Sequence, residues 1–168
     1  RIHSGLLAAV PATGLLGRLT GRLRKPEAVR GLYFWGGVGR GKTFLVDLFY
    51  DGLPIEQKYR THFHRFMRGI HETLREHKGE ADPLARIARQ WSQRLRVLVL
   101  DEFFVNDIGD AMILARLLER MFAEGIVLVT TSNVDPPDLY RDGLQRARFL
   151  PAIELIGNHC QVLYLDSA

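Results

Sequence analysis

The stretch Gly36-Gly37-Val38-Gly39-Arg40-Gly41-Lys42-Thr43 decides the fold, because it matches the pattern G-x-x-x-x-G-K-[ST] of a phosphate-binding loop. Apolar residues 32–35 precede it and a helical pattern over residues 42–50 follows it, which is the strand–loop–helix order that the motif requires. Its glycines let backbone N–H groups converge on phosphates, and the helix N-terminus adds a positive dipole. We expect a nucleotide-binding loop, with Lys42 reaching the β- and γ-phosphates and the Thr43 hydroxyl coordinating Mg²⁺.

Five short apolar runs are expected to form β-strands that alternate with helices. The expected strands cover residues 32–35, 59–63, 95–100, 126–131 and 161–165, and the expected helices cover residues 42–50, 66–78, 83–93 and a long segment that ends at Glu124. Asn106 or Asp107 is expected to cap the long helix. Within the third of these strands, residues 97–100 lack polar alternation, which is typical of a strand buried on both faces. The pattern predicts an α/β fold with a five-stranded parallel sheet flanked by helices.

Polar side chains follow two of the expected strands where each one ends. Asp101 and Glu102 come directly after strand 95–100, and Asn133 follows strand 126–131. The carboxyl ends of parallel strands lie at one edge of the sheet, where ligands bind. We expect Asp101 to hold the Mg²⁺ shell, Glu102 to act as a general base, and Asn133 to position the attacking water. The alternatives are that the carboxylates cap the next helix and that Asn133 is an ordinary loop residue.

Arg146 and Arg148 lie in the segment 143–151, well after the strands that build the site. An arginine that reaches the γ-phosphate of a neighbouring subunit can speed hydrolysis by ~10³–10⁵-fold. Exposed arginines more often form surface salt bridges. The residues alone do not decide between these two roles.

The tripeptide His62-Phe63-His64 is a second candidate site. In a strand it would place two imidazoles on one face, as a metal pair requires. His71 would have to fold back to supply a third ligand. Because no third ligand stands at close spacing, we assign no metal to this pair.

Length and composition bound the remaining classes. The 168 residues fit one domain, and 46% apolar side chains exclude a largely disordered or collagen-like chain. One cysteine cannot form an internal disulfide, so the fold needs no oxidising compartment. The longest uncharged stretch, residues 2–17, falls short of the ~18 apolar residues that span a bilayer. We expect a cytoplasmic protein, and Arg1 in place of Met indicates a fragment of a longer chain.

Charge is divided unevenly along the chain. Residues 1–100 carry 18 basic and 8 acidic side chains, net +10, whereas residues 101–168 carry 5 basic and 11 acidic ones, net −6. A basic half is compatible with nucleic acid, anionic lipid or nucleotide phosphate, although scattered arginines require no polyanion.

Residues 1–30 are a basic lead-in in which residues 13–25 have an amphipathic helical pattern, suited to peripheral membrane contact, a partner groove or packing on the domain. Residues 31–168 are the expected core domain.

Taken together, the motifs resemble the AAA+ superfamily and, more narrowly, the ZapE-type cell-division ATPases and their mitochondrial relatives. The matching segments are Gly31-Leu32-Tyr33-Phe34-Trp35 with the phosphate-binding loop, His62-Phe63-His64-Arg65-Phe66-Met67, residues 101–111, Thr131-Ser132-Asn133, and residues 139–146 through Phe149-Leu150-Pro151. They cover most of residues 31–165. The first is shared by many ATPases, whereas the second, third and last are far more family-specific.

The resemblance implies an AAA+ P-loop NTPase core with a Walker A loop at residues 36–43, Walker B Asp101 with catalytic Glu102, and Asn133 as the sensor-one residue. It also implies an arginine finger, for which Arg146 in the family's Gln-Arg pair is favoured over Arg148. Bacterial members are ATPases that associate with the FtsZ division ring, and mitochondrial members assist protein quality control at the inner membrane. AAA+ proteins continue into a helical lid that this chain lacks, so we expect weak hydrolysis by residues 1–168 alone.

The leading expectation is an Mg²⁺-dependent ATPase that works as a ring of identical subunits, such as a hexamer, and remodels or regulates a protein partner such as FtsZ. The alternative is a nucleotide-gated DNA-binding module of the helicase-loader type, which would use the basic half. A GTPase is disfavoured because no Asn-Lys-x-Asp guanine-reading tetrad is present. A kinase is disfavoured because the adjacent carboxylates and Asn133 suit activation of water.

Overall fold

The computed structural model describes residues 29–37, 39 and 41–166. Its sheet has five strands in the order β2-β3-β4-β1-β5, and every neighbouring pair is parallel. The strands are β1 (Gly31–Trp35), β2 (Lys58–His62), β3 (Val97–Asp101), β4 (Val127–Ser132) and β5 (Cys160–Tyr164). The helices are α3 (Gly41–Gly52), α4 (Phe63–Glu76), α5 (Pro83–Ser92), α6 (Ile108–Ala123) and α7 (Leu150–His159), with short 3₁₀ turns η1 (Pro136–Asp138) and η2 (Arg146–Arg148). The predicted parallel α/β sheet is confirmed.

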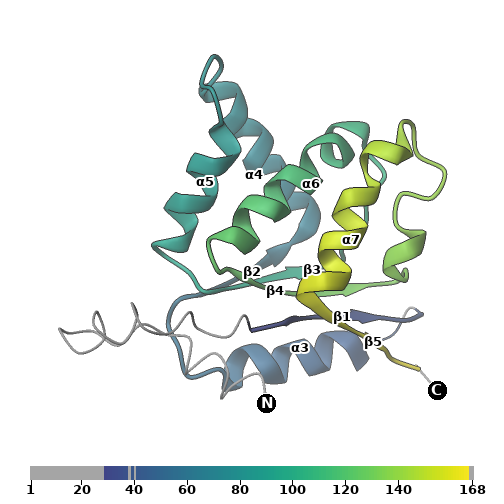
Figure 1. Cartoon of the computed structure of the whole chain (residues 1–168). Helices are drawn as coiled ribbons and strands as arrows, with labels where there is room; N and C mark the ends of the chain where they lie inside the picture. Colours follow the sequence, from purple (N-terminus) through teal and green to yellow (C-terminus); the bar gives the residue numbers. More distant parts are fainter. Residues whose placement is uncertain (1–28, 38, 40, 167–168) are drawn as a thin grey trace.

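Helices cover both faces of the sheet. Helix α3 lies against one face, and α4, α5, α6 and α7 lie against the other (Figure 1). Successive side chains of a strand point to opposite faces, and β3 shows the result: Leu98 packs in the core under α4–α7, whereas Val97 and Val99 pack in the core with Val46 of α3. The four apolar residues of β3, Val97 to Leu100, are buried as their sequence predicts, and the fifth residue, Asp101, is buried as well.

The boundary between β2 and α4 differs from the sequence prediction. The strand ends at His62, and Phe63 begins the helix, three residues earlier than the expected 66–78. Phe63 is 1% exposed, and the centroid of its ring lies 4.4 Å from that of Phe103. This tertiary packing favours a helix that begins at Phe63. His62 and His64 are therefore not on one face of a strand, and that prediction was wrong.

Helix α6 begins at Ile108, and Asp107, one of the two expected caps, stands directly before it. The side chain of Asp107, rather than that of Asn106, accepts a hydrogen bond from the backbone N–H of Asp110 at 3.0 Å.

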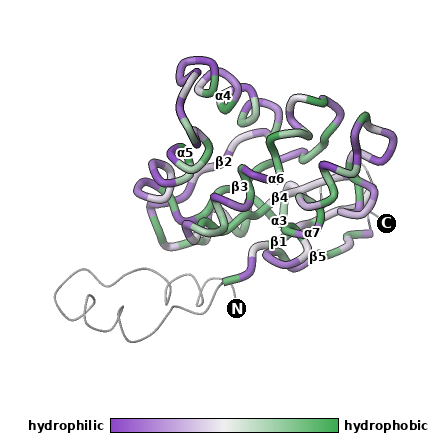
Figure 2. The backbone as a smooth tube through the Cα atoms, turned by 45° about the horizontal axis from the view of Figure 1, so that its top comes forward, coloured by the Kyte–Doolittle hydropathy of each residue, from purple (hydrophilic) through white to green (hydrophobic). Residues whose placement is uncertain are grey.

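The outer end of α4 and its turn toward α5 are coloured hydrophilic in Figure 2 and face away from the sheet. The predicted amphipathic helix at residues 13–25 lies outside the described residues. Within the described part of the chain, no helix has the length and apolar character needed to cross a membrane.

Candidate active site

The phosphate-binding loop connects β1 to α3 and is fixed by close backbone contacts at its first residue. Gly36 has φ 158° and its N–H donates to the carbonyl oxygen of Ser132 at 3.2 Å. A Cβ atom on Gly36 would lie 2.2 Å from the carbonyl oxygen of Leu165, so only glycine fits here. Gly37, Gly39 and Gly41 follow in the connection and the first turn of α3. Val38 and Arg40 lie outside the described residues.

Lys42 is buried inside this loop. Its ammonium donates to the carbonyl oxygens of Gly36 at 2.8 Å and Gly37 at 2.6 Å, and to Oδ1 of Asn133 at 3.1 Å. Burial lowers the pKa of Lys42 from its ordinary value. Since Asn133 follows β4, this bond joins the predicted phosphate-binding loop directly to the predicted sensor residue.

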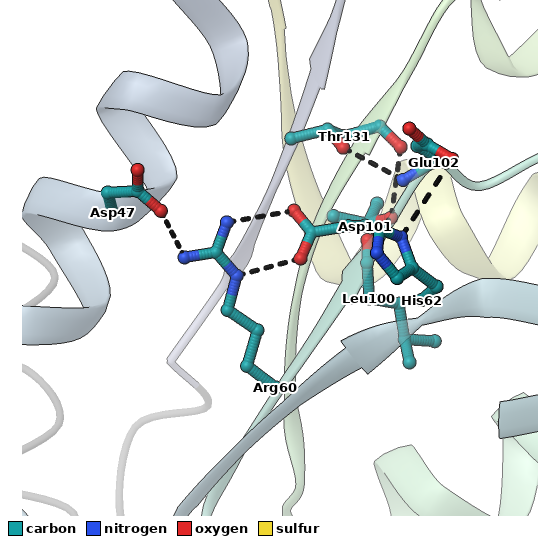
Figure 3. Close-up of polar contacts among 8 residues, drawn as sticks. Asp47, Arg60, His62, Leu100, Asp101, Glu102 and Thr131 are labelled. Carbon is teal, nitrogen blue, oxygen red and sulfur yellow. Dashed lines mark hydrogen bonds and ion pairs between the residues drawn. The ribbon is translucent and has the colours of Figure 1, made fainter. Parts of the chain in front are cut away.

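Asp101 ends β3 and is held by an arginine that the sequence did not single out. Its carboxylate accepts two hydrogen bonds from Arg60 of β2, at 2.7 Å from Nε and 3.2 Å from Nη2 (Figure 3). The third guanidinium nitrogen of Arg60 donates to Asp47 of α3. The bond to Asp101 is the main reason that the pKa of Arg60 rises above its ordinary value, so Arg60 carries its positive charge throughout the physiological range.

Glu102 projects its carboxylate away from this buried pair. Its backbone has φ 56°, and its N–H donates to the hydroxyl of Thr131 at 3.0 Å. The side chain is 77% exposed, and Oε2 lies 3.8 Å from Nδ1 of His62. The turn after β3 thus separates the two carboxylates: Asp101 is directed into the sheet edge and Glu102 toward solvent (Figure 3).

Two adjoining hollows at the carboxyl edge of the sheet bring the predicted site residues together. One of about 530 Å³ is lined by residues that include Gly39, Lys42 and Asn133. The other, of about 520 Å³, is lined by residues that include Arg60 and Asp101. Three residues line both hollows: Thr43, Glu102 and Thr131. The hydroxyl of Thr43 and the carboxylates of Asp101 and Glu102 are hard oxygen ligands of the kind that Mg²⁺ prefers.

The two candidate arginines have different surroundings, and neither lines these hollows. The guanidinium of Arg146 donates to the carbonyl oxygens of Pro137 at 2.6 Å, Leu139 at 3.3 Å and Tyr140 at 3.1 Å. Arg148 is exposed and its guanidinium donates to the side-chain oxygen of Gln145 at 3.1 Å. Arg146 therefore fastens its own loop, whereas Arg148 faces solvent.

The histidines group differently from the sequence expectation. The rings of His62 and His64 stack with centroids 5.9 Å apart, whereas the polar partner of His71 comes from another helix. Nε2 of His71 lies 2.6 Å from Oδ1 of Asp110, and Asp107 completes a cluster whose ligand atoms lie within 4.8 Å of one another. This contact ties α4 to the first turn of α6.

Sequence reasoning missed Arg60, Asp47 and Thr131. Arg60 sits in a strand whose other residues also include charged and polar side chains, so its role shows only once β2 lies next to β3. A signal for Thr131 was present, because a hydroxyl residue stands directly before Ser132 and Asn133 at a strand end.

Comparison with known proteins gives a consistent result. The AFG1-like ATPase family model matches residues 3–168. The chain is 55% identical over 166 residues to "Cell division protein ZapE" of Escherichia coli K12, covering 98% of this chain and 43% of that protein. It is 39% identical over 154 residues to "Lactation elevated protein 1 homolog B" of Danio rerio, covering 85% of this chain and 31% of that protein. The chain thus spans less than half the length of these relatives.

Solved structures share the fold at low sequence identity. A crystal structure of DnaI superposes with a TM-score of 0.62 at 18% identity, covering 95% of this chain and 90% of that chain. A crystal structure of the DnaC helicase loader gives 0.59 at 18% identity, covering 89% and 85%. These likenesses confirm the predicted α/β fold. With the family model spanning nearly all of its residues, the chain belongs to the AFG1-like ATPase family.

Proposed function

We propose that this chain is the nucleotide-binding core of an Mg²⁺-dependent ATPase. One observation carries the proposal: Lys42, Thr43, Asp101, Glu102 and Asn133 line two adjoining hollows at one sheet edge. A bound Mg²⁺ ion would neutralise charge on the phosphate oxygens, with Thr43 and Asp101 holding its coordination shell. The carboxylate of Glu102 is exposed to solvent, so it has access to water and can take its proton. Asn133 presents its amide beside Lys42, where it can orient that water.

We also propose that hydrolysis is completed by a neighbouring subunit in a ring, such as a hexamer. The segment 143–151 does not line the hollows of its own chain, which supports action in trans. The resemblance favoured Arg146, but its guanidinium is bonded to three carbonyl oxygens of its own loop. Arg148 is the exposed arginine, and we assign the finger to Arg148 and the fastening of the loop to Arg146.

The partner of the assembly is proposed from the relatives. The E. coli relative is named as a cell division protein, and the resemblance to the ZapE type implies a protein partner such as the FtsZ ring, met in the cytoplasm. ATP-driven changes at the sheet edge would then be used to regulate or remodel that partner.

Substitution of Lys42 by methionine tests the proposal at its first step. K42M is expected to weaken binding of a fluorescent ATP analogue by about tenfold to a hundredfold, because charged hydrogen bonds to the phosphates are lost. Fluorescence titration in excess Mg²⁺ measures the affinity. Lys78→Met, which removes an exposed lysine beyond the end of α4, is the matched control and should bind as the wild type does. Wild-type affinity in K42M would contradict the assignment.

A second function has one observation in its favour. A hollow of about 410 Å³ at the edge strand β2 combines the aromatic rings of Tyr59, Phe66 and Trp91 with Arg65 and Arg94. Aromatic and basic side chains together suit single-stranded nucleic acid, and the fold resembles that of a helicase loader. DNA binding that weakens steeply with salt in the presence of ATP would support this function. No binding at low salt would exclude it.

A further inference from the structure

Three side chains that can ligate a metal meet between two helices, outside the proposed ATP site. His71 lies in α4, Asp107 stands directly before α6, and Asp110 lies in the first turn of α6. Nε2 of His71 is 2.6 Å from Oδ1 of Asp110, and one ligand atom from each of the three residues lies within 4.8 Å of the others. None of the three lines the two hollows that contain Lys42 and Asp101.

The backbone at Gly109 makes room for this cluster. A Cβ atom on Gly109 would lie 2.8 Å from Oδ1 of Asp107 and 3.4 Å from Cε1 of His71. The first distance is too short for a non-bonded contact, so any side chain here would displace the carboxylate. Glycine is a poor helix former, yet it stands in the first turn of α6, where it lets the carboxylate and the imidazole approach each other.

A hollow of about 660 Å³ opens beside the cluster and is lined by all three residues, so an ion and its water ligands can enter from solvent. The same hollow is lined by three exposed cations, Arg68, Arg75 and Lys78. These positive charges outnumber the two carboxylates, so net charge alone attracts no cation to this place. A metal held here depends on its bonds to the ligands, which favours an ion that binds imidazole strongly over Mg²⁺ or Ca²⁺.

We propose that His71, Asp107 and Asp110 form a binding site for a divalent transition-metal ion, with Zn²⁺ as the representative of that class. Zn²⁺ accepts one imidazole nitrogen and two carboxylate oxygens as ligands, and three protein ligands leave a fourth position for water. The ion replaces the hydrogen bond between His71 and Asp110 with a bond to each of them, and it adds Asp107. Bound metal thereby fastens α4 to the start of α6. This site is separate from the one proposed for Mg²⁺ and does not depend on the proposed ATPase function.

The test measures Zn²⁺ binding by competition with a chromophoric chelator, after EDTA treatment and desalting, in excess Mg²⁺. Mg²⁺ fills sites that are made of oxygen ligands alone but competes poorly for a site that contains an imidazole. The wild type is expected to bind Zn²⁺ under these conditions. At a hundredfold excess over Kd, Zn²⁺ should raise the melting temperature by about 5 °C or more, because the ion binds the folded state.

Asp107→Asn removes one ligand and preserves the helix cap, since asparagine caps a helix as well as aspartate does. D107N should bind Zn²⁺ about tenfold or more weakly than the wild type, while its melting temperature without metal stays within about 3 °C. His71→Gln should weaken binding to the same extent, and its amide can still donate to Asp110. Asp138→Asn is the matched control, because it changes an exposed aspartate outside the cluster in the same way. D138N should bind Zn²⁺ as the wild type does.

Two results would overturn the inference. A wild type that binds no Zn²⁺ in excess Mg²⁺ would leave the cluster as a hydrogen-bonded contact between α4 and α6. Equal Zn²⁺ affinities in D107N and the wild type would place the metal elsewhere, and D107N decides this point even where H71Q does not fold. Both measurements are made without nucleotide, so neither result bears on the proposed ATPase function.

Discussion

Glu102→Gln is expected to lower ATP turnover by about 10²–10⁴-fold, because a glutamine amide cannot accept the proton of the attacking water. The affinity for ATP should stay within about threefold, since the Glu102 side chain is largely exposed and glutamine keeps its size. Steady-state phosphate release gives the turnover, and titration with the fluorescent analogue gives the affinity.

The matched control for this substitution is Glu154→Gln, which changes an exposed glutamate of α7 in the same way. It should hydrolyse ATP at the wild-type rate. Unchanged turnover in E102Q would remove Glu102 from the mechanism and leave its exposed carboxylate without a catalytic role. If the ATP affinity of E102Q fell by as large a factor as its turnover, the result would instead indicate that Glu102 acts in binding.

Arg148→Ala is expected to lower turnover by about 10³-fold or more, because the charge that develops on the transferred phosphoryl group loses its partner across the subunit interface. ATP affinity should change little, since Arg148 does not line the hollows of its own chain. Arg146→Ala should show a different signature, a lower melting temperature, because three carbonyl oxygens lose their donor. Turnover assays and thermal unfolding separate the two roles.

Mixing two inactive variants tests the action in trans directly. In a mixture of R148A and E102Q subunits, an R148A subunit keeps Glu102 and its neighbour can supply Arg148. About one quarter of the interfaces in an equal random mixture would combine both intact groups, so activity should reappear. A mixture as inactive as its two components would contradict a finger that acts between subunits.

Much of the site could be predicted because its chemistry is encoded in short local patterns. The phosphate-binding loop, the Asp101-Glu102 pair and Asn133 each stand at the end of an apolar strand, and parallel strands bring such ends to one edge. The rule does not give the order of the strands in the sheet. Neither the neighbours of β3 nor the position of β2 at the edge can be read from the sequence, and both come from the structure.

The features that escaped prediction depend on contacts between distant segments. Arg60 and Asp101 are 41 positions apart and meet because β2 pairs with β3. Phe63 looked like the end of a strand but begins a helix, because its ring packs against Phe103. The different environments of Arg146 and Arg148 depend on how the loop after η1 folds back, which no periodicity reveals.

The backbone at Glu102 has a consequence for how this site can evolve. Its φ of 56° lies in the left-handed region, where residues other than glycine, asparagine and aspartate are disfavoured by about 1–2 kcal/mol. Selection for a more stable fold alone would place glycine at this turn, which would erase the exposed carboxylate. Under the mechanism proposed above, stability and activity trade off against each other at this position. A stabilised descendant of this chain that keeps its chemistry must gain its stability elsewhere.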